Sequence, residues 1–234
     1  GIRDDLVTGV QTCALPIYFR AMPAFSESMN MAGLKWVNSH ARNKDKKLPA
    51  VMAVLILNDP ETGQPLAILD GTSLTNLRTG AAGGVAINHL ANPRAQQAAF
   101  IGAGIQAIYQ ARALFAIFFF KQKTAYDPNQ DSVKRFVDAV KEMKATLDVQ
   151  VQHEASAGLA AADIIITTTP SKDPLVFSHQ VKPGAHINAI GADAPGKQEL
   201  DSVLIKDAYI VVDDVTQASH SGEINVPLVQ NIIQ

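Results

Sequence analysis

The pattern of apolar and polar positions changes character near Gln96. Before this point, residues 48–59 form an apolar run typical of a β-strand. The run ends in the turn-forming stretch DPETGQP, and residues 67–70 follow as a partner strand. This pattern predicts a β-hairpin. Residues 73–90 then predict a helix with small residues on one face, where glycine allows close packing or a close backbone approach to a ligand.

After Gln96, short apolar segments alternate with helical ones. Strands are expected at 97–101, 148–152, 162–169, 186–192 and 208–214, and helices at 105–115, 131–143, 154–162 and 199–205. In the helix at 131–143, the apolar residues Val133, Phe136, Val137 and Val140 share one face. Because strands that alternate with helices pair in parallel, we expect an α/β fold whose parallel sheet is covered on both faces.

Composition narrows the possible functions. The 234 residues contain 20 Lys and Arg against 22 Asp and Glu, which removes the electrostatic case for a nucleic acid or an anionic membrane as partner. No apolar run approaches the ~20 residues of a membrane span. The single cysteine, Cys13, excludes an intrachain disulfide and a cysteine-cluster metal site. The six histidines lack metal-ligand spacing, so we expect no metal.

Two segments resemble translated sequencing-library adapter rather than natural protein. GIRD (1–4) and VTGVQTCALPI (7–17) match reading frames of a common adapter, and FKQKTAY (120–126) matches another frame of the same DNA. Because one DNA string accounts for two separated peptides, we expect residues 1–17 and about 118–126 to be foreign. The chain also stops without a closing element, so we expect an incomplete reading frame, about two-thirds to three-quarters of a larger subunit.

A glycine-rich turn joins the strand at 97–101 to the next helix. It has the form GxGxxA: Gly102, Ala103, Gly104, Ile105, Gln106 and Ala107. Its glycines allow a tight turn and let a pyrophosphate reach the N–H groups and dipole of the helix. Asp127 follows 25 residues after Gly102, where a carboxylate would bind ribose hydroxyls and repel the 2′-phosphate of NADP. The turn predicts NAD binding, with a plain strand–helix turn as the alternative.

Three basic residues and one acid are candidates for a substrate site: Arg20, Lys35, Arg78 and Asp193. The apolar neighbours of Lys35 indicate a partly buried amine, which needs a partner or an anionic ligand. The alternative for any single basic residue is a solvated charge on the surface. Asp193 follows a predicted strand, at the edge where open α/β sheets bind ligands, unless it is a cap or turn carboxylate. Thr168, in the stretch TTTPS, would line a cofactor or make a turn.

Several long motifs resemble the ornithine cyclodeaminase/mu-crystallin family, and most closely its archaeal-type alanine dehydrogenase branch. The motifs, in the family's order, are FRAMPAF, AGLKWVNSH, LRTGAAGG, FIGAGIQA, HINAIGADAPGKQELD and SGEINV. The resemblance runs from about Phe19 to about Pro227 and fails at 1–17 and around 118–126. The family's N-terminal helix region and C-terminal return segment are missing, and its GGEI reads SGEI at 221–224.

The resemblance implies a Rossmann-type, doubly wound, mostly parallel NAD-binding domain at 96–220. A second α+β domain, for substrate binding and homodimer formation, would comprise 18–95 and a return segment that begins at 221–234. Arg20 and Arg78 would hold the substrate carboxylate, for which planar guanidinium groups are well suited. Lys35 would act on the substituents of the carbonyl or imine carbon, and Asp193 on the amino group. The cofactor set would be Thr79, Gly102, Ala103, Gly104, Gln106, Ala107, Asp127 and Thr168.

The resemblance also implies an activity: a cytoplasmic NAD-dependent enzyme that converts L-alanine to pyruvate and ammonia reversibly. Its partners would be a small amino or keto acid and a second copy of the chain. An ornithine cyclodeaminase and a ketimine or pyrroline-carboxylate reductase are alternatives. A non-enzymatic, crystallin-like binding protein is another, against which the presence of Lys35 and Asp193 argues.

Overall fold

The chain forms two compact units in a computed structural model that describes residues 18–143, 146 and 148–234. The first unit extends to Arg78 and the second comprises Thr79–Gln234. The division falls within helix α1 (Gly71–Leu90), so the functional domain boundary expected after residue 95 stays a prediction. The adapter-like segment 1–17 lies outside the described residues.

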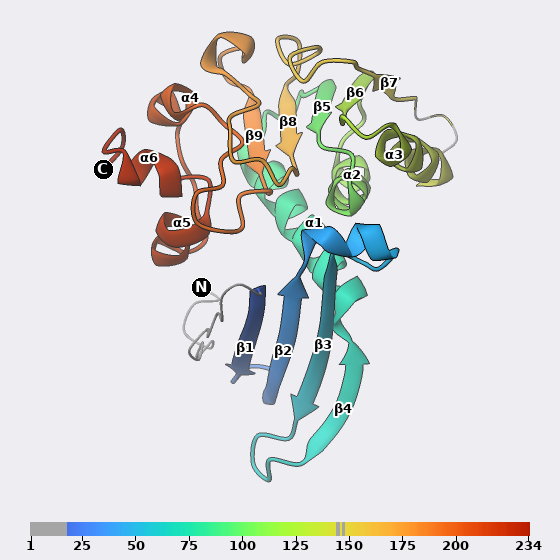
Figure 1. Ribbon diagram of the computed structural model, residues 1–234, viewed down its shortest axis with the longest axis vertical. Coiled ribbons are helices and arrows are strands. Elements are labelled where there is room, and N and C mark those ends of the chain that lie inside the picture. The colour runs from blue at the N-terminus through green and yellow to red at the C-terminus, as the bar shows by residue number, and fades with distance from the viewer. Residues whose placement is uncertain (1–17, 144–145, 147) are drawn as a thin grey trace. The chain divides into compact units, whose positions relative to one another are not determined.

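The first unit is a four-stranded antiparallel sheet in which the strands follow chain order (Figure 1). Its strands are β1 (Tyr18–Ser26), β2 (Met31–Ser39), β3 (Val51–Asn58) and β4 (Pro65–Asp70), with a short 3-10 helix at Ala41–Lys46. The predicted hairpin is confirmed as β3 and β4. Helix α1 begins directly after β4, where Asp70 accepts a hydrogen bond from the backbone of Thr72.

The second unit is a five-stranded parallel sheet of order β7-β6-β5-β8-β9, which confirms the α/β expectation. Its strands are β5 (Gln97–Ile101), β6 (Gln122–Tyr126), β7 (Gln150–Val151), β8 (Ile164–Thr167) and β9 (His186–Ala189). Its later helices are α2 (Ile105–Ile117), α3 (Gln130–Met143), α4 (Ser202–Asp207), α5 (Val215–Ser221) and α6 (Asn225–Val229), with a 3-10 turn at Ser178–Gln180. In Figure 1, α2 and α3 lie beside the β5–β7 half and α4 to α6 beside β9.

Alternate residues of β5 face opposite cores. Ala98 and Phe100 pack with α1, α2 and α3 on one face of the sheet. Ala99 and Ile101 pack on the other face with the turn around Leu159 and with α4. Burial of consecutive residues is expected of a central parallel strand, because both faces of such a sheet are covered.

Two predicted elements are absent. The helix predicted at 154–162 is a series of turns, because Gly158 has φ +88° and a Cβ there would lie 2.7 Å from the Thr124 hydroxyl. The strand predicted at 208–214 has no ladder partner within the described residues, and Tyr209 is 93% exposed. Its apolar composition is typical of a strand, but a strand exists only where a neighbour accepts its hydrogen bonds.

The segment 118–126 contributes strand β6, whose residues pair in parallel with β5 and bury Lys123. The Lys123 ammonium donates to the carbonyl oxygen of Phe120 at 3.4 Å. A lysine is rarely so buried. The expectation that this segment is foreign stays a prediction, which the raw nucleotide sequence would test.

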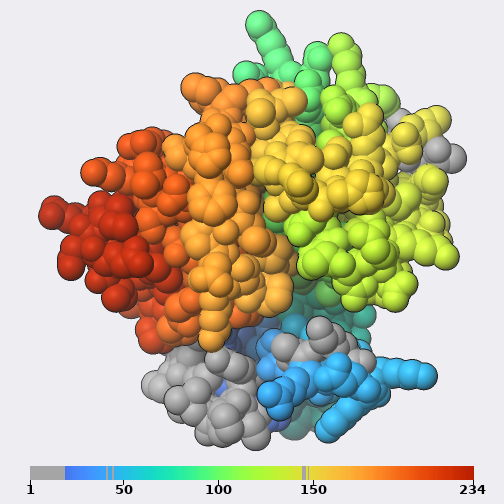
Figure 2. Space-filling view, turned by 45° about the horizontal axis from the view of Figure 1, so that its top comes forward, coloured from blue at the N-terminus to red at the C-terminus, as the bar shows by residue number. Residues whose placement is uncertain are grey.

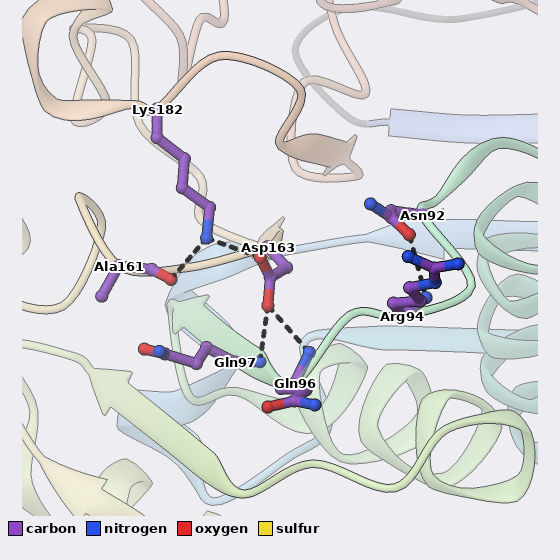
Figure 3. A network of polar contacts seen from close by, with 7 residues as sticks. All are labelled: Asn92, Arg94, Gln96, Gln97, Ala161, Asp163 and Lys182. Carbon is purple, nitrogen blue, oxygen red and sulfur yellow. Dashed lines mark hydrogen bonds and ion pairs between the residues drawn. The ribbon is translucent and has the colours of Figure 1, made fainter.

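A network of partly exposed polar groups joins the amino ends of β5 and β8 (Figure 3). One Asp163 oxygen accepts the backbone N–H groups of Gln96 and Gln97 at 2.8 and 3.0 Å, and the other pairs with Lys182 at 2.5 Å. Burial alone would raise the pKa of Asp163, but these donors outweigh it and hold the pKa below its usual range. These contacts hold the amino ends of β5 and β8 together.

No described helix is long and apolar enough to cross a membrane.

Candidate functional site

The opposite edge, where the strands have their carboxyl ends, carries the glycine turn. Gly102 follows β5 with φ +91°, a left-handed conformation that favours glycine. A Cβ on Gly102 would lie 2.9 Å from Thr169 Cγ2 and 3.0 Å from Thr168 Oγ1. Its N–H donates to the carbonyl of Tyr126, the last residue of β6, at 2.8 Å. The turn is therefore fixed between the ends of β6 and β8.

The second glycine of the turn faces open space. Gly104 is the N-cap of the thirteen-residue helix α2, and no side chain caps it. A Cβ built on Gly104 meets no heavy atom within 4 Å among the described residues. Gln106 lies in the first turn of α2, and Ala107 is fully buried against the sheet. An open approach to uncapped helix N–H groups is what an anionic phosphate ligand requires.

Asp127 lies directly after β6 and contacts the same turn. One carboxylate oxygen accepts from Ala103 N at 2.9 Å, and the other from Asn129 N at 2.8 Å. Because an ionised carboxylate has about four acceptor positions, these two bonds leave capacity for ribose hydroxyls. The turn and the acid that the sequence separates by 25 residues therefore meet, as a dinucleotide site needs.

The ends of β8 and β9 form the other side of this edge. The Thr168 hydroxyl donates to the Gly102 carbonyl at 3.2 Å. Asp193 lies in the loop after β9, where its carboxylate pairs with Lys197 at 2.5 Å while the side chain stays half exposed. Since β5 and β8 are neighbours whose chain connections run in opposite directions, this is the switch point at which such sheets bind ligands.

Sequence reasoning missed a buried carboxylate in the same loop. Glu199 accepts hydrogen bonds from Thr167, Thr169 and Gly191 at the ends of β8 and β9. Burial raises its pKa, while the hydrogen bonds lower it in part. Glu199 is part of the motif HINAIGADAPGKQELD, but nothing in a single sequence distinguishes this buried acid from the exposed acids nearby.

Helix α1 is held against α2 next to Thr79. The buried Gln110 side chain donates to the Thr79 carbonyl at 3.0 Å. Cβ atoms on Gly80 and Gly83 would lie 2.6 Å from the Tyr109 carbonyl oxygen and 1.9 Å from the Gln110 side chain. The small-residue face predicted for this helix therefore serves close helix packing.

The first unit gathers the three predicted cations. Arg20 on β1 lies opposite Val37, and Lys35 on β2 lies opposite Met22, so both side chains share one face of the sheet. Burial, together with the positive charges of Arg78 and Arg20, lowers the pKa of Lys35 to about 8. Two guanidinium charges close to a partly buried amine create a site for an anion.

The predicted residues thus form two groups. Arg20, Lys35 and Arg78 belong to the first unit. The second unit holds Thr79 on α1 and, at the carboxyl edge of its sheet, the turn with Asp127, Thr168 and Asp193. Across the described ranges, no group of three or more His, Cys, Asp or Glu side chains is placed to hold a metal ion.

Comparisons with known proteins identify the family to which the chain is similar. Residues 12–234 match the profile of the ornithine cyclodeaminase/mu-crystallin family. The chain is 51% identical over 214 residues to an alanine dehydrogenase of Archaeoglobus fulgidus, covering 92% of this chain and 65% of that protein. It therefore spans less than two thirds of the length of this relative.

Two solved structures are similar along nearly the whole chain. An archaeal alanine dehydrogenase dimer with bound NAD has 47% identity and a TM-score of 0.90, and the match covers 98% of this chain and 70% of that one. The Δ1-pyrroline-2-carboxylate reductase of Thermococcus litoralis, in complex with NADH and L-proline, has 31% identity and a TM-score of 0.93, with 98% and 72% covered.

Proposed function

The chain belongs to the ornithine cyclodeaminase/mu-crystallin family, and from this premise we propose that it is an NAD-dependent oxidoreductase that deaminates L-alanine to pyruvate and ammonia, reversibly. The observation that carries the redox activity is the glycine turn, which is open at Gly104 and has the Asp127 carboxylate on its Ala103 N–H. The choice of alanine is supported by 51% identity to an alanine dehydrogenase.

The residues at the carboxyl edge fit a dinucleotide. The uncapped start of α2 offers N–H groups to a pyrophosphate, and the Asp127 carboxylate suits a free ribose 2′-hydroxyl better than a phosphate. Both solved relatives named above contain NAD or NADH. A bound nicotinamide would supply the redox chemistry by accepting hydride from the substrate Cα, and the protein would bind and orient the reactants.

The cations of the first unit fit the carboxylate of an amino acid. We assign Arg20 and Arg78 to hold that carboxylate, because planar guanidinium groups bind it through two parallel hydrogen bonds. With a pKa of about 8, Lys35 is present in both charged and neutral forms near neutral pH. Lys35 can therefore polarise the carbonyl or imine and move a proton there.

Asp193 is assigned to the substrate nitrogen. Its half-exposed carboxylate can accept a proton from an ammonium group and return it, once its contact with Lys197 yields to the substrate. Thr79 and Thr168 would contact the cofactor along with Gly102, Ala103, Gly104, Gln106 and Ala107.

A cyclic imino-acid reductase is the second candidate. The observation that favours it is the TM-score of 0.93 to a reductase bound to NADH and L-proline, which exceeds the value for the alanine dehydrogenase. An ornithine cyclodeaminase would need the same carboxylate clamp and cofactor turn. The three activities therefore differ in the rest of the substrate.

The first unit presents an apolar surface suited to a second copy of the chain. Trp36, Val54 and Ile68 lie on the sheet face opposite to Lys35, with 42%, 42% and 72% of their surfaces exposed, and the Phe19 ring stacks on Trp36 at 5.4 Å. An exposed apolar patch of this kind marks an interaction site. A relative is known as a dimer, and we propose a homodimer here as well.

Steady-state assays test the activity. L-Alanine with NAD should give net NADH, and the reverse reaction should consume NADH only with pyruvate and ammonia. Net NADH oxidation with a cyclic imino acid in place of alanine turnover would establish the reductase. Release of ammonia from ornithine without net NADH would establish the cyclodeaminase.

The Asp193→Asn variant tests the catalytic assignment. Because the amide cannot accept the proton, turnover should fall by a factor of about 100 or more, with NADH affinity largely kept. Asp138→Asn, on the exposed side of α3, is the matched control and should retain full turnover. Undiminished turnover in Asp193→Asn would remove Asp193 from the mechanism.

A further inference from the structure

Glu199 bridges two neighbouring strands at the point where their ladder ends. The last paired residues are Thr167 of β8 and Ala189 of β9, and Ile190 N makes the final backbone bond to the Thr167 carbonyl at 2.9 Å. Just beyond, one Glu199 oxygen accepts the Thr167 hydroxyl and Gly191 N, both at 2.7 Å, and the other accepts Thr169 N at 2.5 Å. The carboxylate thus continues the connection between the strands.

The chain is shaped around this carboxylate. A Cβ on Gly191 would lie 2.0 Å from the Thr169 carbonyl oxygen and 2.6 Å from the Glu199 carboxyl carbon. Only glycine fits there without displacing the strand ends. Since Thr169 Cγ2 also lies against Gly102, the contacts of Glu199 reach the glycine turn through one residue.

Each residue contacted by Glu199 is a near neighbour of a proposed site residue. Thr168, which donates to the Gly102 carbonyl, is flanked on both sides by Glu199 partners. Asp193 lies two residues after Gly191 and donates its N–H to the Gly191 carbonyl at 3.0 Å. A shift of Thr169 or Gly191 would therefore move a site residue just beyond the end of each strand.

A second acid holds the backbone of Glu199 itself. Glu223 Oε1 accepts Glu199 N at 2.8 Å and Leu200 N at 2.6 Å. Its Oε2 is buried and has no hydrogen-bond partner in the described part of the chain. Burial and the charge of Glu199 raise the pKa of Glu223 to about 7, although the two backbone N–H groups oppose the rise. Figure 2 shows this C-terminal segment, in red, packed against the orange segment that contains β9.

A fully buried carboxylate is costly unless it is hydrogen-bonded, and here three donors bind its two oxygens. We propose that Glu199 is a positioning residue of the cofactor edge, which joins the ends of β8 and β9 and so keeps Thr168 and Asp193 in place. This inference rests on the proposed NAD-dependent function, because it assumes that a dinucleotide binds at this edge.

Glu199→Gln is the decisive variant. If the amide oxygen keeps the Thr167 and Gly191 bonds, the amide NH₂ opposes Thr169 N–H, and this conflict should displace the segment that contains Thr168. NADH binding, measured by fluorescence titration of the full chain, should weaken about tenfold because a buried donor loses its acceptor. A carboxylate that only stabilised the fold would alter the melting temperature and leave the affinity of the folded chain unchanged.

Glu223→Gln is the matched control. It also removes a buried carboxylate of raised pKa, but its amide oxygen keeps both backbone bonds and its NH₂ takes the place of Oε2. Its NADH affinity should stay within about twofold of wild type. Equal NADH affinities in Glu199→Gln and wild type would overturn the positioning role, as would an equal loss of affinity in Glu223→Gln.

Thr167→Val is a second test of the positioning role of Glu199, and it remains informative if Glu199→Gln does not fold. It deletes one of the three donors, is nearly isosteric and makes no proposed contact with the cofactor. NADH binding should weaken about threefold. An unchanged affinity would contradict the inference. If the wild-type chain itself binds no NADH, the proposed function fails, which is a result distinct from equal binding by wild type and variants.

Discussion

At the scale of single residues, Lys35 combines a stability cost with a proposed role. Its pKa falls from 10.5 in a free chain to about 8, because of burial and of the charges of Arg78 and Arg20. The folded state therefore binds fewer protons between pH 8 and 10.5, so this group's penalty on folding is full below pH 8 and disappears as the pH rises through that range.

Lys35→Met should stabilise the fold and impair the enzyme. The full shift would correspond to ~3 kcal/mol, but because Lys35 is only half buried, solvent screening reduces the expected gain to about 1 kcal/mol at pH 7. The gain should vanish near pH 10.5, and turnover should fall by a factor of about 100 or more. Thermal melting at the two pH values, with Lys141→Met on α3 as control, measures the effect; a gain independent of pH would contradict it.

The site residues that could be predicted from the sequence are marked by a regular spacing, whereas the residues that were missed are defined by contacts in the folded chain. The glycine turn and Asp127 are separated by a spacing that follows from one strand and one helix, so they can be predicted. Glu199, Glu223 and Gln110 act through burial and through hydrogen bonds to groups that lie up to 32 residues away in the chain. Their roles depend on which loops meet, and no local pattern encodes that.

At the scale of elements, substitution by alanine should change protein stability differently at two glycines, one within α1 and one at the start of α2. In α1, a Cβ on Gly83 would lie 1.9 Å from Gln110, so Gly83→Ala should lower stability by about 1–3 kcal/mol despite the better helix propensity of alanine. At the start of α2, Gly104 has open space and an extended backbone, so Gly104→Ala should leave stability nearly unchanged.

NADH affinity, unlike stability, should be sensitive to the substitution at Gly104. Gly104→Ala places a methyl group where the backbone would approach a pyrophosphate, and NADH binding should weaken about tenfold or more. Melting curves and NADH titrations on both variants separate packing from binding. Tight NADH binding by Gly104→Ala would indicate that the cofactor does not use this turn.

Element prediction succeeded where the local pattern and the tertiary partner agree. The strand 97–101 and helices 105–117 and 130–143 formed close to the expected bounds because their apolar positions face a sheet or a core. The alanine-rich segment 154–162 has a helical composition, but Gly158 is left-handed where it passes Thr124. Residues 208–214 have the composition of a strand but no ladder partner among the described residues. In both segments, tertiary contacts and not local composition determined the structure.

At the scale of the whole molecule, the apolar sheet face of the first unit determines the expected assembly. Strand alternation places Ile68 on this face and Leu69 on the face that carries Lys35. If a second copy covers the Ile68 face, burying its hydrophobic side chains supplies the association energy, and a stable interface needs about 800 Å² from each partner. A buried charge at its centre would oppose that association strongly.

Ile68→Lys should therefore convert the proposed dimer into a monomer, while Leu69→Lys, one residue away and partly exposed on the other face, should leave the dimer intact. Sedimentation velocity at micromolar concentration measures the change, and NADH titration of each chain checks that the second unit keeps its cofactor site. A wild-type monomer at these concentrations would exclude the homodimer, and equal dissociation by both variants would mean that the interface does not follow the alternation of β4.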